Sequence, residues 1–217
     1  ALARASAAAA TAADVADALA WLHSRGVSHG DLTCSNVLLS TCCAPDDDDE
    51  SADGTGDRRA FRAKVSDFGL AHDLAADAAA TSAVTSAASA STSSASSFST
   101  SSPSSSLPLP PHGTVTHMPP ERLAGGAPSP EADVFSLGVV LWSMLAASKP
   151  WAGLSAPQVV RRVGIEGLSL PVPPPPDGCA GNDELEAVLR SCLERDPRRR
   201  PGAEEAARRL REVARKL

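Results

Sequence analysis

The sequence contains no tyrosine, and aromatic residues make up only 3% of its 217 positions. Control through phosphorylation of its own tyrosines is therefore excluded. The apolar fraction of 42% is enough for a core, although much of it is alanine. No apolar run reaches the roughly 20 residues that a membrane-spanning helix needs. The longest run, Val134 to Ala147, is predicted to form a buried helix, and the total length suits one ordinary domain.

Cysteine pairs with metal-binding spacing are also absent. The five cysteines form no CxxC pair, and an odd count with two adjacent members is a poor disulfide framework. Reduced thiols in a cytosolic or nuclear setting are therefore expected. No secretory signal segment opens the chain. A formal net charge of -6 argues against a general nucleic-acid-binding surface, and we expect neither a nucleic-acid partner nor a membrane segment.

Two segments have a composition that does not support a packed structure. Ala75 to Pro111 is almost entirely Ser, Ala, Thr and Pro, too poor in large apolar groups to repay the entropy of ordering. A second loop, about residues 40–62, contains the acidic run from Asp46 to Glu50 and a Gly-rich stretch. We predict disordered insertions at about 40–62 and 75–111.

Elsewhere the hydrophobic pattern predicts mainly helices with a few short strands. Gly26 is a stop signal for a helix over Thr11 to Arg25. Short strands are predicted at Val37–Leu39 and Ala63–Val65. Further helices are expected over residues 131–147, 155–163, 183–195 and 203–217. The stretch from Pro171 to Pro176 is predicted to be an extended connector, or else a ligand for a Pro-recognition domain.

The chemistry is concentrated in two motifs, His29-Gly-Asp-Leu-Thr-Cys-Ser-Asn36 and Ser66-Asp-Phe-Gly69. An Asp and an Asn five residues apart, with a second Asp on a later turn, can place one base and two metal ligands around a nucleotide triphosphate. Their oxygen donors suit Mg²⁺. The alternative interpretation is that Asp31 and Asn36 are ordinary turn formers. Three further motifs follow in order, at residues 113–121, 133–139 and 196–201.

Taken in this order, the five motifs resemble the C-terminal lobe of a eukaryotic protein kinase, most closely the tyrosine-kinase-like group of serine/threonine kinases. The resemblance implies an α+β protein-kinase-like fold, with residues 1–217 forming the mainly helical C-terminal lobe with short strands. It implies transfer of the γ-phosphate of ATP to Ser and Thr hydroxyls of protein substrates, with ATP and Mg²⁺ as cofactors. No Gly-x-Gly-x-x-Gly precedes His29 and no Lys precedes Lys64. The N-terminal lobe, which would be the partner of this one, is therefore expected to be missing, and the fragment alone to be inactive.

The resemblance also implies a role for individual residues. Asp31 would orient the substrate hydroxyl and accept its proton, Asn36 and Asp67 would bind Mg²⁺ and the nucleotide, and Leu38 would form the floor under the adenine ring. The remaining matches are structural, and they are His29, Phe68, Gly69, Thr114, Glu121, Asp133 and Arg200. Among these, Glu121 and Arg200 match a buried ion pair, and Asp133 matches the helix residue that accepts hydrogen bonds from the catalytic-loop backbone.

Four positions depart from the family pattern. Gly30 replaces the usual Arg, Thr33 the usual Lys, His117 a Tyr and Pro119 an Ala. The first two changes remove cations that would clamp a phosphorylated activation segment and contact the transferring phosphate. They support an alternative, a non-catalytic kinase-like scaffold. Small-molecule phosphotransferases that modify aminoglycosides or choline share the first motif, but they lack the three later ones.

Overall fold

The computed structural model describes residues 2–41, 59–74, 114–173 and 183–217. Helices dominate and strands are few and short, as expected. Most of the two predicted insertions lies outside the described residues. The elements are α1 (Leu2–His23), β1 (Val27–Ser28), η1 (Cys34–Asn36), β2 (Val37–Thr41), β3 (Phe61–Val65), β4 (His72–Asp73), η2 (Val115–His117), α3 (Pro120–Leu123), α4 (Pro130–Ala146), α5 (Ala156–Val160), η3 (Arg161–Ile165), α6 (Asp183–Cys192), η5 (Pro197–Arg199) and α7 (Ala203–Lys216).

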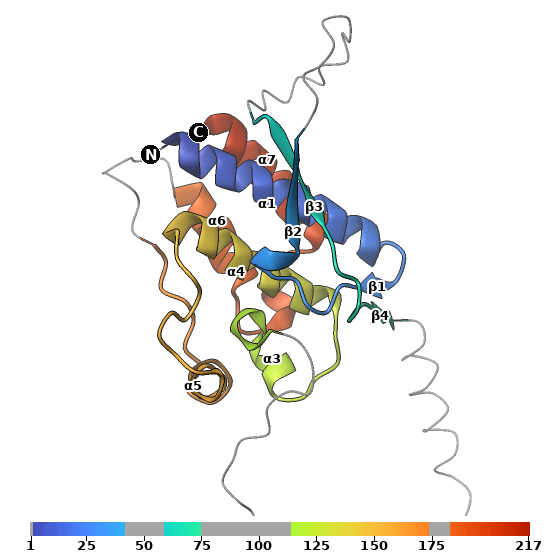
Figure 1. Ribbon diagram of the computed structural model, residues 1–217, viewed down its shortest axis with the longest axis vertical. Helices are drawn as coiled ribbons and strands as arrows, with labels where there is room; N and C mark the ends of the chain where they lie inside the picture. Colours follow the sequence, from blue (N-terminus) through green and yellow to red (C-terminus); the bar gives the residue numbers. More distant parts are fainter. Residues whose placement is uncertain (1, 42–58, 75–113, 174–182) are drawn as a thin grey trace, which may run out of the picture.

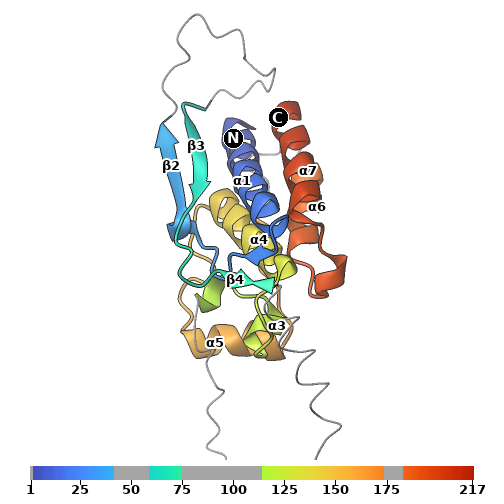
Figure 2. The ribbon, with the colours of Figure 1, turned by 90° about the vertical axis from the view of Figure 1, so that its right-hand side faces the viewer.

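The helices form a bundle with a strand hairpin on one side. Figure 2 shows β2 and β3 at one edge, α6 and α7 at the other, and α1 and α4 between them. Figure 1 shows α3 and α5 at the end of the molecule opposite the N- and C-termini. The strands form two separate antiparallel pairs, β1 with β4 and β2 with β3. The chemistry-bearing motifs lie where the hairpin meets this bundle.

Helix α1 begins at Leu2, nine residues before the expected start at Thr11, and ends at His23. Alanine is the strongest helix former, so the Ala-rich start extends the helix readily. Helix α1 also packs against α7, whose buried residues recur about every three or four positions. Gly26, in the left-handed conformation with φ 72°, follows the helix as predicted.

Helix α4 is the centre of the bundle, with every residue from Ala132 to Trp142 buried. It begins at Ser129, whose hydroxyl accepts a hydrogen bond from the Ala132 N–H at 3.1 Å. A Cβ at Gly138 would lie 2.9 Å from the Cys192 Cβ, so only glycine allows α6 to approach this closely. The prediction of a buried helix is confirmed, and no described helix is long and apolar enough to cross a membrane.

Both ends of one predicted loop and the end of one predicted helix were also wrong. The predicted loop at 40–62 overlaps the hairpin at both ends, because Ser40 pairs with Arg62 and Thr41 with Phe61. The helix predicted to reach Arg195 ends at Cys192. Pro197 restricts the residue before it, and Asp196 instead caps η5 by accepting from the Arg198 N–H at 3.0 Å. The helix predicted over 155–163 is α5, which continues as the π-helical turn η3.

Candidate active site

The site is built on Asp133, a carboxylate in the first turn of α4 that is only 2% exposed. Its Oδ2 accepts from the His29 N–H at 2.8 Å and the Ser28 hydroxyl at 3.0 Å, and lies 2.9 Å from the His23 Nε2. Its Oδ1 accepts from the Gly30 N–H at 2.9 Å. A buried carboxylate is tolerated only with such partners. The backbone just before Asp31 is therefore fixed to the most buried helix.

Asp31 follows directly and is half-buried. Its Oδ1 accepts from the Thr114 N–H at 2.8 Å, across 83 residues of sequence. Its carbonyl accepts from the Asn36 side-chain amide at 2.9 Å, and its own N–H donates to the His29 Nδ1 at 3.3 Å. Asp31 Oδ2 has no hydrogen-bond partner among the described residues. The fold thus holds one carboxylate oxygen and leaves the other available.

The turn that carries Asp67 lies beside this loop and is exposed. Asp67 adopts a positive φ of 64°, and its Oδ1 accepts from the Gly69 N–H at 3.2 Å. The Ser66 N–H donates to the Asn36 carbonyl at 2.9 Å. The structure therefore joins the two motifs through backbone contacts as well as through side chains.

His29 connects the same two motifs from inside the molecule. It is fully buried, its Nε2 lies 3.1 Å from the Ser66 carbonyl, and its ring centroid lies 5.4 Å from that of Phe68. Phe68 itself is 50% exposed. On β2, Leu38 and Leu39 are also more than half exposed. Leu38 and Leu39 are consecutive on the strand, so their side chains point to opposite faces of the hairpin.

Two oxygen donors in this region suit a hard cation such as Mg²⁺. Because the Asn36 amide donates its N–H to the Asp31 carbonyl, its Oδ1 is left as an acceptor. The Asp67 carboxylate is exposed, and only its Oδ1 has a partner among the described residues. Within the same part of the chain, no group of three or more His, Cys, Asp or Glu residues is arranged to hold a metal. Asn36 Oδ1 and the Asp67 carboxylate are therefore the candidate cation ligands that the two motifs offer.

Gly30 packs closely against the backbone just after the second motif. Its φ is +77°, and a Cβ there would lie 2.5 Å from the Leu70 carbonyl oxygen. Both the conformation and the contact exclude other side chains unless the backbone moves. The local backbone therefore leaves no room at this position for the Arg that the family carries.

An ion pair fastens α3 to the loop before α7. Arg200 has a fully buried side chain, and its two Nη atoms lie 2.6 and 2.9 Å from the two Glu121 carboxylate oxygens. It also donates to the carbonyls of Glu131, Glu194 and Arg195. The sequence predicted this pair, and the structure shows that Glu121 is the more exposed partner, at 27%.

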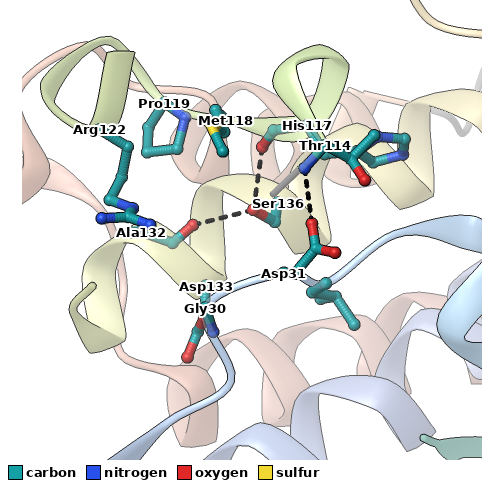
Figure 3. Close-up of a pocket in the computed structure, with 11 residues that line it drawn as sticks. Gly30, Asp31, Thr114, His117, Met118, Pro119, Arg122, Ala132, Asp133 and Ser136 are labelled. Atoms are coloured by element: carbon teal, nitrogen blue, oxygen red, sulfur yellow. Dashed lines mark hydrogen bonds between the residues drawn. The ribbon is translucent and has the colours of Figure 1, made fainter. Parts of the chain in front are cut away.

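Asp31 also lines an open pocket between the loop of residues 29–36, the segment from Thr114 to Arg122 and α4 (Figure 3). Burial lowers the pKa of His117 in this pocket to about 4, and nearby Asp31 opposes this effect only in part. Thr33, at the start of η1, is buried rather than projecting into the site.

Sequence reasoning missed His23, Ser136 and Arg122. Arg122 directly follows Glu121, so its position beside a motif could have drawn attention to it. Ser136 lies inside the motif at residues 133–139 but was given no role there, and His23 lies at a position that no motif includes. Ser136 donates its hydroxyl to the His117 carbonyl at 2.9 Å, and this contact joins α4 to the pocket wall.

Two family models match the chain. Residues 94–210 match the protein kinase domain, and residues 3–106 match the protein tyrosine and serine/threonine kinase model. The chain is 27% identical to a mitogen-activated protein kinase kinase kinase of Drosophila melanogaster, over 94% of this chain and 14% of that protein. It is 31% identical to the serine/threonine-protein kinase PkaB of Streptomyces coelicolor, over 95% of this chain and 39% of that protein.

A plant relative extends the comparison. The serine/threonine-protein kinase CTR1 of Arabidopsis thaliana is 27% identical over 87% of this chain and 17% of its own length. The chain therefore spans much less than half the length of each of these three relatives.

Proposed function

The chain belongs to the protein kinase family, and we propose that the protein carrying this domain transfers the γ-phosphate of ATP to Ser and Thr hydroxyls of other proteins. The relatives confirm the expected resemblance to the tyrosine-kinase-like group of serine/threonine kinases. The substrate class and the activity itself belong to the proposal. The observation that carries it is the placement of Asp31.

Asp31 is suited to act as the catalytic base. Its Oδ1 is engaged by the Thr114 N–H, and its backbone is held by Asp133 through the two preceding residues. Oδ2 is then free to accept a hydrogen bond from a substrate hydroxyl and later its proton. Positioning of this kind is most of what a protein contributes to phosphoryl transfer.

Asn36 and Asp67 would hold Mg²⁺ with the nucleotide phosphates, and Leu38 would lie under the adenine ring. Bound Mg-ATP supplies the phosphoryl group and the cation that offsets its charge. Asn36 is prepared for this role because its amide nitrogen is occupied and its oxygen is not. The positive φ of Asp67 and its hydrogen bond with Gly69 shape the turn that presents the second ligand.

The other matched residues would keep these groups in register. His29 and Phe68 link the two loops, and Glu121 with Arg200 fastens the segment that carries Thr114. An N-terminal lobe that completes the nucleotide site, and the inactivity of these residues without it, stay predictions.

A non-catalytic scaffold is the second candidate, and Gly30 is the observation that favours it. Neither the Arg expected at position 30 nor the Lys expected at position 33 is present. The buried site of Thr33 offers no cation to a transferring phosphate. In this reading the domain would bind partners, with or without Mg-ATP, and would transfer nothing.

A kinase assay on the full-length protein separates the two. We expect Mg-ATP-dependent phosphorylation of Ser and Thr peptides, none of Tyr peptides, and loss of activity in Asp31→Ala. Asp17→Ala, on the exposed face of α1, is the control that should keep wild-type activity. An Asp31→Ala protein as active as wild type would contradict the base assignment. A wild-type protein that binds Mg-ATP without turnover would establish the scaffold.

A further inference from the structure

The pocket beside Asp31 contains a cation that the proposed mechanism does not use. Arg122, the third residue of α3, lines it together with Asp31, Asp133 and Ser136. Its one hydrogen bond to a described residue runs from Nη1 to the Gly126 carbonyl at 2.7 Å. Arginine has five N–H donors in a planar fork. Nη2 and Nε are therefore available for a second acceptor.

The carboxylates of Glu121 and Asp133, near Arg122, already have other partners. Glu121, its neighbour in sequence, has both carboxylate oxygens on Arg200. Asp133 already contacts four polar groups, which belong to His23 at the end of α1 and to Ser28, His29 and Gly30 after it. His117 is neutral at pH 7, because burial lowers its pKa to about 4. Arg122 is thus the only cation among the pocket-lining residues, and no carboxylate of the described chain pairs with it.

Figure 3 shows Arg122 and Asp31 on opposite sides of this pocket, with Ser136 between them. An extended peptide advances ~3.3–3.6 Å per residue. Because Asp31 and Arg122 line the same open pocket, a substrate whose hydroxyl lies at Asp31 would bring the side chain of a residue close to it in sequence toward Arg122. Carboxylates and phosphates are the groups that a guanidinium binds best, often in bidentate fashion.

We propose that Arg122 selects substrates with an anionic side chain, carboxylate or phosphate, within two residues of the phosphorylated Ser or Thr. This inference rests on the proposed kinase function and adds a specificity-determining residue to it. It also gives a role to the Arg122 guanidinium near the site. At positions 30 and 33, where the family carries cations, this chain has Gly and Thr.

Peptide kinetics with the full-length protein test the proposal. One Ser-containing peptide is varied at each of the two positions before and after the Ser, with Ala, Glu, phosphoserine or Arg. At one or more positions, Glu or phosphoserine should raise kcat/KM about tenfold over Ala, the effect of one charge-assisted hydrogen-bond pair. Arg at the same position should lower it. Comparing Glu with phosphoserine identifies which anion the pocket prefers.

Variants of Arg122 then assign the preference to this side chain. Arg122→Gln should remove the preference while leaving kcat/KM for the Ala peptide unchanged, and Arg122→Glu should reverse it in favour of Arg. Arg122→Lys should keep part of it, because a point charge lacks the fork. Arg162→Gln, an exposed position on η3 outside the pocket, is the matched control that should keep all of it.

Three results would overturn the inference. The first is a wild type that treats Glu, phosphoserine and Ala peptides alike. The second is an Arg122→Gln protein that loses activity on all peptides by the same factor, which would mark Arg122 as purely structural. A wild type that phosphorylates no peptide would contradict the proposed function itself, and this inference with it.

Discussion

The two carboxylates of the candidate active site, Asp31 and Asp67, are held in very different ways. The backbone before Asp31 is bound to Asp133, one of the most buried polar residues of the described chain, and its own carboxylate is bound to Thr114. Asp67 lies in an exposed turn, and the described residues contact its carboxylate only through the Gly69 N–H. One group is fixed by the core and the other by a local turn.

The helical bundle fixes the position of Asp31 before anything binds, whereas it does not fix the position of Asp67. A base must be correctly oriented before the substrate arrives, and burial of its supports makes that orientation rigid. A metal ligand can be ordered by the metal itself. The bundle therefore determines the position of Asp31, whereas the position of Asp67 depends on its own exposed turn.

The largest expected effect comes from exchanging each carboxylate for an amide in the full-length protein. Asp31→Asn should lower kcat by about 10²–10⁴-fold, the usual contribution of a general base, with the Kd for Mg-ATP unchanged. Asp67→Asn should weaken Mg-ATP binding directly. Kinetic assays and calorimetric titration with Mg-ATP measure both. Equal losses of Mg-ATP affinity in the two variants would abolish the distinction between the two carboxylates.

Removing the support of Asp31 should affect stability most. Asp133→Ala strands several buried donors and should lower the free energy of unfolding by about 3–5 kcal/mol. Asp67→Asn, in the exposed turn, keeps a residue that tolerates the left-handed conformation and should change it by no more than about 0.5 kcal/mol. Denaturant unfolding of the purified chain gives both values. Similar losses would show that the Asp67 turn is as well anchored as the catalytic loop.

The pH dependence of stability tests whether the Asp31 side of the site is as buried as the structure indicates. Burial lowers the pKa of His117 from 6.5 to about 4. Between these two pH values the unfolded chain binds the proton and the folded chain does not, so stability falls as pH falls. The total loss should be about 3 kcal/mol and complete below pH 4.

His117→Gln cannot titrate, so its stability profile should be flatter than that of wild type between pH 6.5 and 4. Unfolding midpoints measured across this range provide the comparison. Parallel profiles for the two proteins would mean that His117 is solvated in the folded state.

The smallest expected effect is at the contact between the two regions. Gly30→Ala places a methyl against the Leu70 carbonyl in a left-handed conformation, and should cost about 2 kcal/mol. Gly26→Ala has the same left-handed conformation, at φ +72°, with no atom within 4 Å, and should cost about 1 kcal/mol. The difference in unfolding free energy isolates the close approach. Equal costs would show that the Asp67 turn moves aside freely.

Much of the fold followed from local pattern, and the failures have local causes. The buried helix at α4 and the β2–β3 strands were predicted from apolar runs. The start of α1 at Leu2 was missed because a run of alanines shows no apolar periodicity in the sequence. Which of them are buried is decided only when α1 packs in the bundle, against α7 among others. The ends of the predicted loop at 40–62 were wrong because Ser40 and Arg62 are ordered by pairing with each other.

The sequence by itself determined the family and named the candidate site residues, because motif spacing is written in consecutive positions. Asp31, Asn36 and Asp67 could be named from it, as could the Glu121–Arg200 pair. Only the tertiary structure decided what surrounds them. Asp133 contacts His23 and Gly30, which lie 110 and 103 residues away in the sequence, and no local pattern encodes such contacts. Folding also lowers the pKa of His117 by burial and places the Leu70 carbonyl against Gly30. It likewise decides that Arg122 keeps N–H donors without an acceptor among the described residues.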